Sequence, residues 1–222
     1  MLRLPSMKTI APEQLLEQLN WRYATKQFDA SRKIPAEQWA ALEGALHLSP
    51  SSFGMQQWAF VVVEDPALRE QLKAASWGQP QITDASHMVV FAAKKEVTEK
   101  DVDTYMQRIA EVRGVSPADL SGFRDMVAGM VLQGKTEDER AVWTSRQVYI
   151  PIGVLLTSAA LMGLDACPME GFNAAEYDRI LGLGEKGLTP LAVVTVGYRS
   201  PEDKYAELPK VRFAAEEVIL HA

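Results

Sequence analysis

Continuous apolar runs alternate along this chain with segments in which apolar and polar positions repeat at helical spacing. Residues 58–63, 88–92 and 191–198 are nearly unbroken apolar runs, a pattern typical of central strands that are covered on both faces. Asp65 and Pro66 have the order of an N-cap and a first helical turn. The pattern therefore predicts a buried sheet whose first two strands are separated by a helix.

Helical spacing, proline and capping residues predict most of the remaining structure. Helices are predicted over residues 12–19, from 35 to a loop at 49–52, over 101–132 with a break near 114–117, over 141–162 and from 173 to 181. The polar stretch 134–140 is expected to be a mobile connection. The short apolar tail 218–220 has the composition of a segment that can pair with a sheet edge.

Composition narrows the class of protein. The 222 residues are 47% hydrophobic and contain no linker-like stretch, which predicts a single domain over residues 1–222. A net charge of −6 with scattered Lys and Arg argues against a nucleic-acid partner. The longest apolar stretch, residues 148–164, contains Pro151 and is shorter than the roughly 20 residues of a membrane span. A single cysteine and no secretory pattern at the start predict a cytoplasmic protein without membrane partners.

Two sequence features resemble functional motifs, but their context argues against a dinucleotide-binding site and against a metal site. Residues 182–187 match the glycine spacing of a dinucleotide fingerprint, but they follow a helix and precede a strand, the reverse of the order that the fingerprint requires. We interpret Gly182 and Gly184 as helix-stop residues. The three histidines lack metal-ligand spacing, and Cys167 has no histidine nearby in the sequence, so we predict no metal site and a cysteine that packs as a small hydrophobe.

Three groups of residues are candidates for ligand binding, and each also has an ordinary structural interpretation. The first group consists of four cations, Arg22 and Lys26 near the start of the chain and Lys210 and Arg212 near its end. These cations are either solvated charges or a cluster that converges on a phosphate. The polar loop 49–58 is either a simple connection or a cradle for a polyhydroxylated chain. Residues 167–172 predict a turn bounded by Pro and Gly, which can aim main-chain N–H groups at a flat ring.

The order of these segments resembles a known family. The matching stretches are residues 22–29, 49–58, 84–87, 163–172, 197–200 and 208–212, which together span nearly the whole chain. In this combination they resemble the FMN-dependent nitroreductase family, of the oxygen-insensitive type that uses NADH or NADPH. The resemblance implies an α+β sandwich in which helices flank a mixed, mostly antiparallel sheet. It also implies an intertwined homodimer with FMN sites at the interface.

Carried over position by position, the resemblance implies a set of cofactor-binding residues. They are Arg22, Tyr23, Ala24, Lys26, Pro50, Ser51, Ser52, Gln79, Pro168, Met169, Glu170, Gly171, Lys210 and Arg212. In this assignment Arg22, Lys210 and Arg212 hold the phosphate, and Lys26 tunes the flavin electrostatically. The main-chain N–H groups of residues 170–171 face the flavin N5, and residues 50–52 come from the partner subunit. Gln81 is the alternative to Gln79.

The resemblance also implies how such a protein works. NAD(P)H passes a hydride to the flavin N5 and leaves, and a nitroaromatic or quinone acceptor then takes the same place, without a catalytic side chain. Tyr105, Phe123 and Met126 are either a cover over the substrate or ordinary core residues. Three alternatives stay open. The first is a reductase on the same fold whose substrate is free flavin, an enone or a pteridine. The second is a flavin-binding redox sensor without turnover, and the third is a helical interaction protein without a cofactor.

Overall fold

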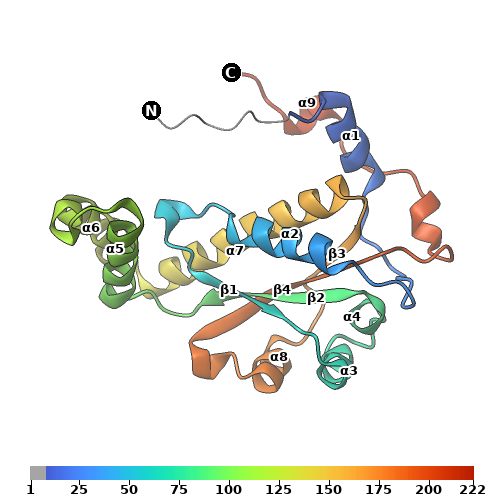
Figure 1. Cartoon of the computed structure of the whole chain (residues 1–222), viewed down its shortest axis with the longest axis horizontal. Coiled ribbons are helices and arrows are strands. Elements are labelled where there is room, and N and C mark those ends of the chain that lie inside the picture. Colours follow the sequence, from blue (N-terminus) through green and yellow to red (C-terminus); the bar gives the residue numbers. More distant parts are fainter. Residues whose placement is uncertain (1–8) are drawn as a thin grey trace.

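The fold is built on one sheet of four antiparallel strands in the order β1-β2-β4-β3 (Figure 1). The computed structural model describes residues 9–222. The strands are β1 (Trp58–Val62), β2 (His87–Lys94), β3 (Asp165–Met169) and β4 (Leu188–Gly197). An isolated parallel bridge joins Ala24 to Ala166 beside β3. The predicted mixed, mostly antiparallel sheet is therefore confirmed.

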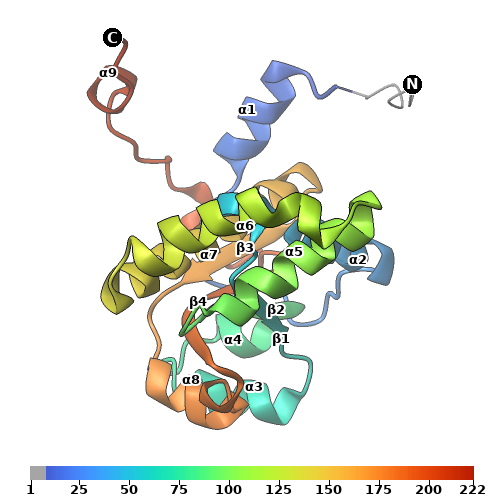
Figure 2. The same ribbon diagram turned by 90° about the vertical axis from the view of Figure 1, so that its left-hand side faces the viewer.

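Helices cover both faces of this sheet and extend beyond its two ends (Figure 1). α2 (Ala36–His47) and α7 (Glu137–Leu161) lie on one face, and α3 (Pro66–Ala74), α4 (Gln81–Asp84) and α8 (Ala174–Leu181) lie on the other. At one end lie α5 (Glu99–Arg113) and α6 (Ser121–Ala128). At the other end, α1 (Pro12–Trp21) and α9 (Ala215–Val218) project as two separate arms (Figure 2). This arrangement confirms the predicted α+β class.

Two hydrophobic cores lie on the two faces of the sheet. Phe91 of β2 packs in the core that contains Leu42 of α2 and Leu155 of α7. Met88 of the same strand packs in the core that contains Tyr177 of α8. Successive side chains of a strand point to opposite faces, so one apolar run supplies both cores. The sequence prediction of strands covered on both faces is confirmed.

The structure corrects three local predictions. α7 begins at Glu137, because Thr136 and Glu139 form a reciprocal capping box, so the stretch 134–140 is partly helix. Residues 167–169 belong to β3 and are not part of a turn; a proline is tolerated there because β3 is an edge strand. The tail 218–220 forms no strand in its own chain. The predicted break in the helical region is confirmed by Gly114, a left-handed residue with φ of 66° that ends α5.

In the described residues, no helix is both long enough and apolar enough to cross a membrane. The longest helix, α7, contains Pro151 in its interior and carries buried residues along much of its length, including Val148 and Leu155. It is the principal buried helix of the protein, as the sequence predicted.

Gly197, at the end of β4, lies where Phe28 and the main chain of Ser86 pack too closely for a larger residue. A Cβ there would lie 2.9 Å from Cδ1 of Phe28 and 3.0 Å from the main-chain nitrogen of Ser86. Gly197→Ala should therefore lower the free energy of unfolding by about 1–3 kcal/mol, measured by urea denaturation. Gly44→Ala in α2 is the control, because nothing lies within 4 Å of the added methyl group and alanine favours the helix. Equal stability of the two variants would contradict this packing.

Candidate functional site

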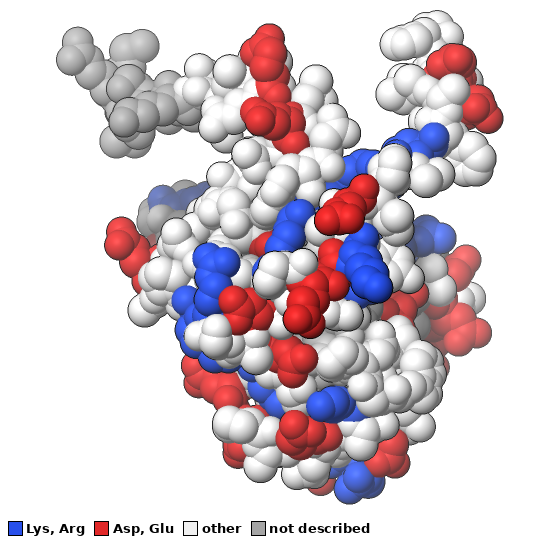
Figure 3. Space-filling model, turned by 90° about the vertical axis from the view of Figure 1, so that its right-hand side faces the viewer, with Lys and Arg blue, Asp and Glu red and all other residues white. Residues whose placement is uncertain are grey.

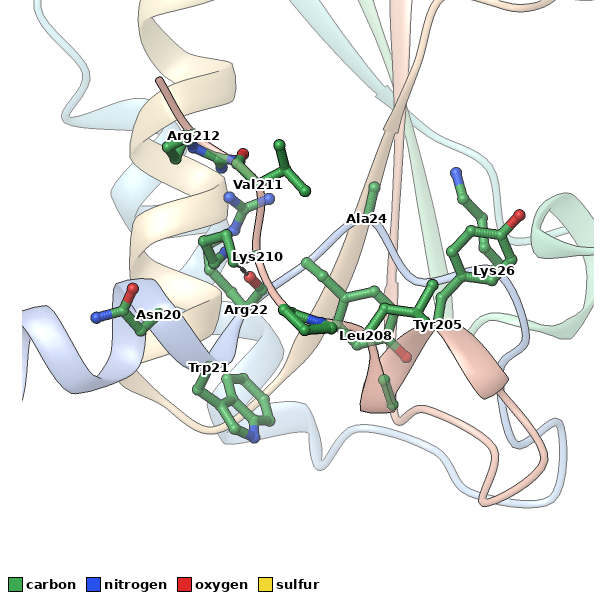
Figure 4. A pocket seen from close by; sticks show the side chains of 13 residues that line it. Asn20, Trp21, Arg22, Ala24, Lys26, Tyr205, Leu208, Lys210, Val211 and Arg212 are labelled. Atoms are coloured by element: carbon green, nitrogen blue, oxygen red, sulfur yellow. Dashed lines mark hydrogen bonds between the residues drawn. The ribbon is translucent and has the colours of Figure 1, made fainter. Parts of the chain in front are cut away.

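A hollow of about 430 Å³ lies where the segment after α1 meets the segment before α9. It is lined by Asn20, Trp21, Arg22, Tyr23, Ala24, Lys26, Tyr205, Ala206, Leu208, Pro209, Lys210, Val211 and Arg212 (Figure 4). Two stretches from opposite ends of the chain thus form one site. Six of the cofactor residues predicted from the sequence line the hollow: Arg22, Tyr23, Ala24 and Lys26 from the first stretch, and Lys210 and Arg212 from the second.

Three cations converge on one side of this hollow. The Lys210 ammonium donates a hydrogen bond to the main-chain oxygen of Arg22. Burial, and then the charge of Arg212, lowers the pKa of Arg22. Burial, and then the charges of Arg22 and Arg212, lowers the pKa of Lys210. Lys and Arg side chains are visible at the base of the two arms (Figure 3). A cluster of mutually repelling cations that is partly removed from water is suited to a dianion such as a phosphate.

Lys26 and Ala24 form the part of the hollow that extends away from these cations. In Figure 4 the Lys26 side chain points away from Arg22, and the Ala24 methyl group lies between them. The Lys26 ammonium is 6.0 Å from the centroid of the Tyr205 ring. Burial raises the pKa of Cys167, and the charge of Lys26 opposes that shift, so Lys26 acts electrostatically on the neighbouring strand β3. The small side chain of residue 24 keeps the space between the charges open.

Asp203 fastens the two halves of the hollow together, and sequence reasoning missed it. Its carboxylate accepts hydrogen bonds from the Tyr23 hydroxyl at 2.8 Å and from the main-chain N–H groups of Lys26 at 2.7 Å and Gln27 at 3.0 Å. The N–H of Tyr205 donates to the other carboxylate oxygen at 3.1 Å. Asp203 is only 3% exposed. The one local signal for it is its place as N-cap of the short turn 204–207.

Asp165 plays a similar part at the start of β3, and it too was missed. It accepts hydrogen bonds at 2.8 Å from the Arg199 main-chain N–H and at 2.7 Å from Nε of the same residue. The Arg199 guanidinium lies 4.2 Å from the ring centroid of Trp21 and 4.6 Å from that of Tyr23. This stacked ion pair fixes the end of α1 against the chain that follows β4.

The loop after β3 carries the other predicted cofactor contacts. Met169 is buried, Pro168 is partly buried, and the Gly171 carbonyl accepts a hydrogen bond from the Gln79 amide at 2.7 Å. Gln79 therefore reaches this loop, whereas the alternative, Gln81, is buried at the start of α4.

Glu170 of the same loop is bonded to α7. The Tyr149 hydroxyl donates a hydrogen bond to the Glu170 carboxylate at 2.8 Å, and burial together with this bond raises the pKa of Tyr149 to about 12.

Other predicted residues lie away from the hollow within one chain. Pro50, Ser51 and Ser52 precede β1 beside α7, where the Ser52 N–H donates to the buried Gln147 at 2.8 Å. The predicted cover residues belong to α5 and α6, at the other end of the sheet from the hollow (Figure 1). Tyr105 and Phe123 pack against a small core there, whereas Met126 is 46% exposed. A single chain therefore brings together only part of the predicted site.

The structure shows no candidate metal centre among residues 9–222. No group of three or more His, Cys, Asp or Glu side chains is placed there so that it could hold a metal ion. His87 instead stacks on Trp39, with ring centroids 4.0 Å apart. Burial lowers the pKa of His87, and nearby Arg69 lowers it further. Cys167 is 2% exposed, in keeping with the packing role predicted for it.

Comparisons with known proteins point to one family. Residues 19–198 match the family model described as "Nitroreductase family". A Staphylococcus haemolyticus protein, provisionally named an NAD(P)H nitroreductase, is 36% identical over 221 residues, covering 93% of this chain and 96% of its own.

Solved structures with the same fold are more distant in sequence. The nitroreductase YdfN of Bacillus subtilis has a TM-score of 0.84 at 20% identity, with 96% of this chain and all of the other covered. A nitroreductase-type protein of Exiguobacterium sibiricum, solved with FMN, has a TM-score of 0.77 at 18% identity, with coverages of 97% and 99%. A gut-bacterial enone reductase has a TM-score of 0.75 at 22% identity, with coverages of 96% and 99%. These structures show the fold.

Asp203→Asn tests the junction between the two chain ends. Removing the charge weakens the hydrogen bonds that Asp203 accepts, so the free energy of unfolding should fall by about 1–3 kcal/mol near neutral pH. Burial works against the charged form, but the bonds from Gln27, Tyr23 and Lys26 prevail and hold the Asp203 pKa below its ordinary 3.8. The stabilisation is thus complete above that value and is lost as the pH falls through the lower folded-state pKa.

Urea unfolding of the two proteins over a series of decreasing pH values measures this difference. The gap in stability between wild type and Asp203→Asn should narrow on acidification. Asp125→Asn, whose side chain is 77% exposed, is the matched control and should leave stability unchanged. A gap that is independent of pH would refute the proposed role of the Asp203 charge.

Proposed function

Because this chain belongs to the nitroreductase family, we propose that it is an FMN-dependent NAD(P)H oxidoreductase that reduces a nitroaromatic or quinone acceptor. The observation that carries the proposal is the convergence of Arg22, Lys210 and Arg212 on one hollow. The chemistry that bound FMN supplies is reversible hydride transfer, first from NAD(P)H and then to the acceptor, in a ping-pong sequence.

The three cations fit the phosphate of FMN. Burial, and then the charges of Arg22 and Arg212, lower the pKa of Lys210, so this arrangement of like charges is unfavourable without a counter-charge. A phosphate dianion would neutralise this repulsion and accept charge-assisted hydrogen bonds from all three side chains. Tyr23 already donates its hydroxyl to Asp203, so its role in this proposal is to position the binding segment.

Lys26 and the loop after β3 would serve the ring. Lys26 lies in the same hollow as the phosphate-binding cations but points away from them, so its charge is available to a second part of the ligand (Figure 4). A fixed cation stabilises negative charge that develops beside it, which is the tuning role that we propose for Lys26. Pro168 and Met169 would pack on the ring, while the main chain of Glu170 and Gly171 and the amide of Gln79 would bind its polar edge.

We also propose that the working unit is a homodimer. Among residues 9–222 of one chain, the apolar side chains of the C-terminal arm stay largely uncovered, with Val211 84% and Phe213 77% exposed. The edge strand β1 carries apolar side chains that are only partly buried, and a hollow beside it is lined by Trp58 and Phe60. A second copy would cover such surfaces and bring its residues 50–52, together with its α5 and α6 region, to the flavin.

A second candidate activity is enone reduction on the same fold, favoured by the similarity in structure to an enone reductase. Reduction of free flavin or a pteridine belongs to the same class, and a flavin-binding redox sensor would bind FMN without turnover. Anaerobic single-turnover reduction by NADH and NADPH, followed by reoxidation with a panel of acceptors, separates these functions. Failure of purified, FMN-loaded protein to oxidise either nicotinamide would refute the oxidoreductase proposal.

Arg212→Met should have opposite effects on stability and on cofactor binding. Losing one charge-assisted bond should weaken FMN binding about tenfold or more, measured by flavin fluorescence titration. Removing a charge that repels Arg22 and Lys210 should raise the melting temperature of the FMN-free protein. Arg108→Met, at an exposed position of α5, is the control for a general loss of charge. Unchanged FMN affinity in Arg212→Met would remove Arg212 from the phosphate site.

The same titration distinguishes Lys26 from the phosphate-binding cations. Lys26→Met should retain most of the FMN affinity but lower the midpoint reduction potential of the bound flavin, because a positive charge near the ring favours the reduced form. Spectroelectrochemical titration measures that potential. A potential equal to that of the wild type would exclude the tuning role.

The homodimer proposal is tested by the mass in solution. Analytical ultracentrifugation of the full chain should give twice the mass of one chain. Deleting residues 213–222, which contain most of the exposed apolar residues of the C-terminal arm, should shift the equilibrium toward the monomer and weaken FMN binding with it. A wild-type protein that sediments as a monomer at micromolar concentration would contradict the proposal.

A further inference from the structure

Trp77, in the short loop between α3 and α4, has a backbone conformation that is unusual for a large residue. Its φ is 56°, and Gly78 follows with φ of 74°. In the described part of the chain, the only other residues besides glycine with positive φ are Phe53 and Gln56. A bulky L-residue in the left-handed region is strained and persists only when its surroundings determine the conformation.

The surroundings of this loop do determine it. The Gly78 N–H donates to the Lys73 carbonyl at 3.0 Å, and the Gln79 N–H donates to the Ser76 carbonyl at 3.1 Å. The Ser76 hydroxyl is buried and lies 2.7 Å from the Tyr177 hydroxyl of α8. The loop is therefore fixed to α3 on one side and to α8 on the other.

The strained conformation does not serve to bury the indole. Trp77 is 73% exposed, although a tryptophan in a well-fixed loop ordinarily gains stability by burying its large apolar ring. The ring instead lies beside Gly171, where a Cβ would be only 2.8 Å from Cζ3 of the indole. The Gln79 amide of the same loop donates to the Gly171 carbonyl. One fixed loop thus presents an open aromatic ring and an amide at the same glycine.

We propose that Trp77 is a specificity-determining residue that contacts the ring of a flat, electron-poor aromatic acceptor beside Gly171. The inference rests on the proposed function, which assigns Gly171 to the polar edge of the flavin. Electron-rich indole stacks favourably, in an offset or edge-on arrangement, on the electron-poor ring of a nitroaromatic or a quinone. An acceptor without an aromatic or quinonoid ring would gain little from this contact. Trp77 therefore favours ring acceptors over aliphatic enones.

The FMN-loaded wild type is compared with Trp77→Ala and Trp77→Phe, using nitrobenzene and ferricyanide as acceptors. Trp77→Ala should raise the KM for nitrobenzene about tenfold, whereas Trp77→Phe, which retains an aromatic face, should restore most of the loss. The rate with ferricyanide and the affinity for FMN should stay within about twofold of the wild type. A binding measurement without turnover accompanies these rates: nitrobenzene titrated into the oxidised protein, which holds no electrons to reduce it, should bind about tenfold more weakly to Trp77→Ala.

Trp77→Gly separates the contact from the fold. Glycine adopts positive φ without strain, so this variant should melt at a higher temperature than Trp77→Ala while binding nitrobenzene as weakly.

The inference is overturned if Trp77→Ala binds nitrobenzene as the wild type does, if Trp77→Phe is as impaired as Trp77→Ala, or if both variants lose FMN. Failure of the proposed function would appear differently, as a wild-type protein that neither retains FMN nor oxidises NAD(P)H.

Discussion

The buried carboxylate of Asp203 is the constraint on which the candidate site depends. It accepts hydrogen bonds from the segment that follows α1 and from its own turn, and so holds the last part of the chain against the first. The junction lies close in sequence to Lys210 and Arg212, and Lys210 bonds to the main chain of Arg22 in the same hollow. Without the bonds of Asp203, the Coulomb repulsion among these three cations would favour their separation, and with it the loss of the hollow between the two chain ends.

The site combines rigid supports with locally unfavourable features. The buried carboxylates of Asp165 and Asp203 are the rigid supports, because each accepts hydrogen bonds from a distant segment of the chain. The repulsion among the cations and the left-handed backbone at Trp77 each reduce the stability of the protein without ligand. Proteins commonly depart from locally favourable structure where they bind ligands, because the ligand contributes the missing interaction. The concentration of such departures around β3 and the two chain ends supports this location for the chemistry.

One chain presents only part of the proposed flavin site. The hollow with its cations lies at one end of the sheet, and the polar loop before β1 and the α5–α6 region lie at the other (Figure 1). In the part of the chain that the structure describes, the two arms and the edge strand β1 leave apolar side chains exposed or only partly buried. The homodimer that we propose would reconcile these observations, because a two-fold axis can bring one end of the first copy to the opposite end of the second.

The sequence by itself determined the local elements and the residue types available for binding. The apolar runs identified three of the strands, and helical spacing, caps and Gly114 identified most of the helices, because burial on both faces and helix termination leave local patterns. The strand β3 was mistaken for a turn, since Pro168 is unusual in a strand and is accommodated only at a sheet edge. Family resemblance, more than spacing, selected Arg22, Lys210 and Arg212 from many surface cations.

Only the tertiary structure decided which of these segments meet. Nothing local in the sequence marks Asp203 and Asp165 as the carboxylates that join distant segments, or places the Trp77 ring against Gly171. Those contacts accompany the strand order β1-β2-β4-β3, in which β3 is an edge strand: its start lies beside the segment after α1, and the residues after its end lie beside the loop before α4. Periodicity records which face of an element is buried, whereas contacts across long loops depend on how the elements pack together.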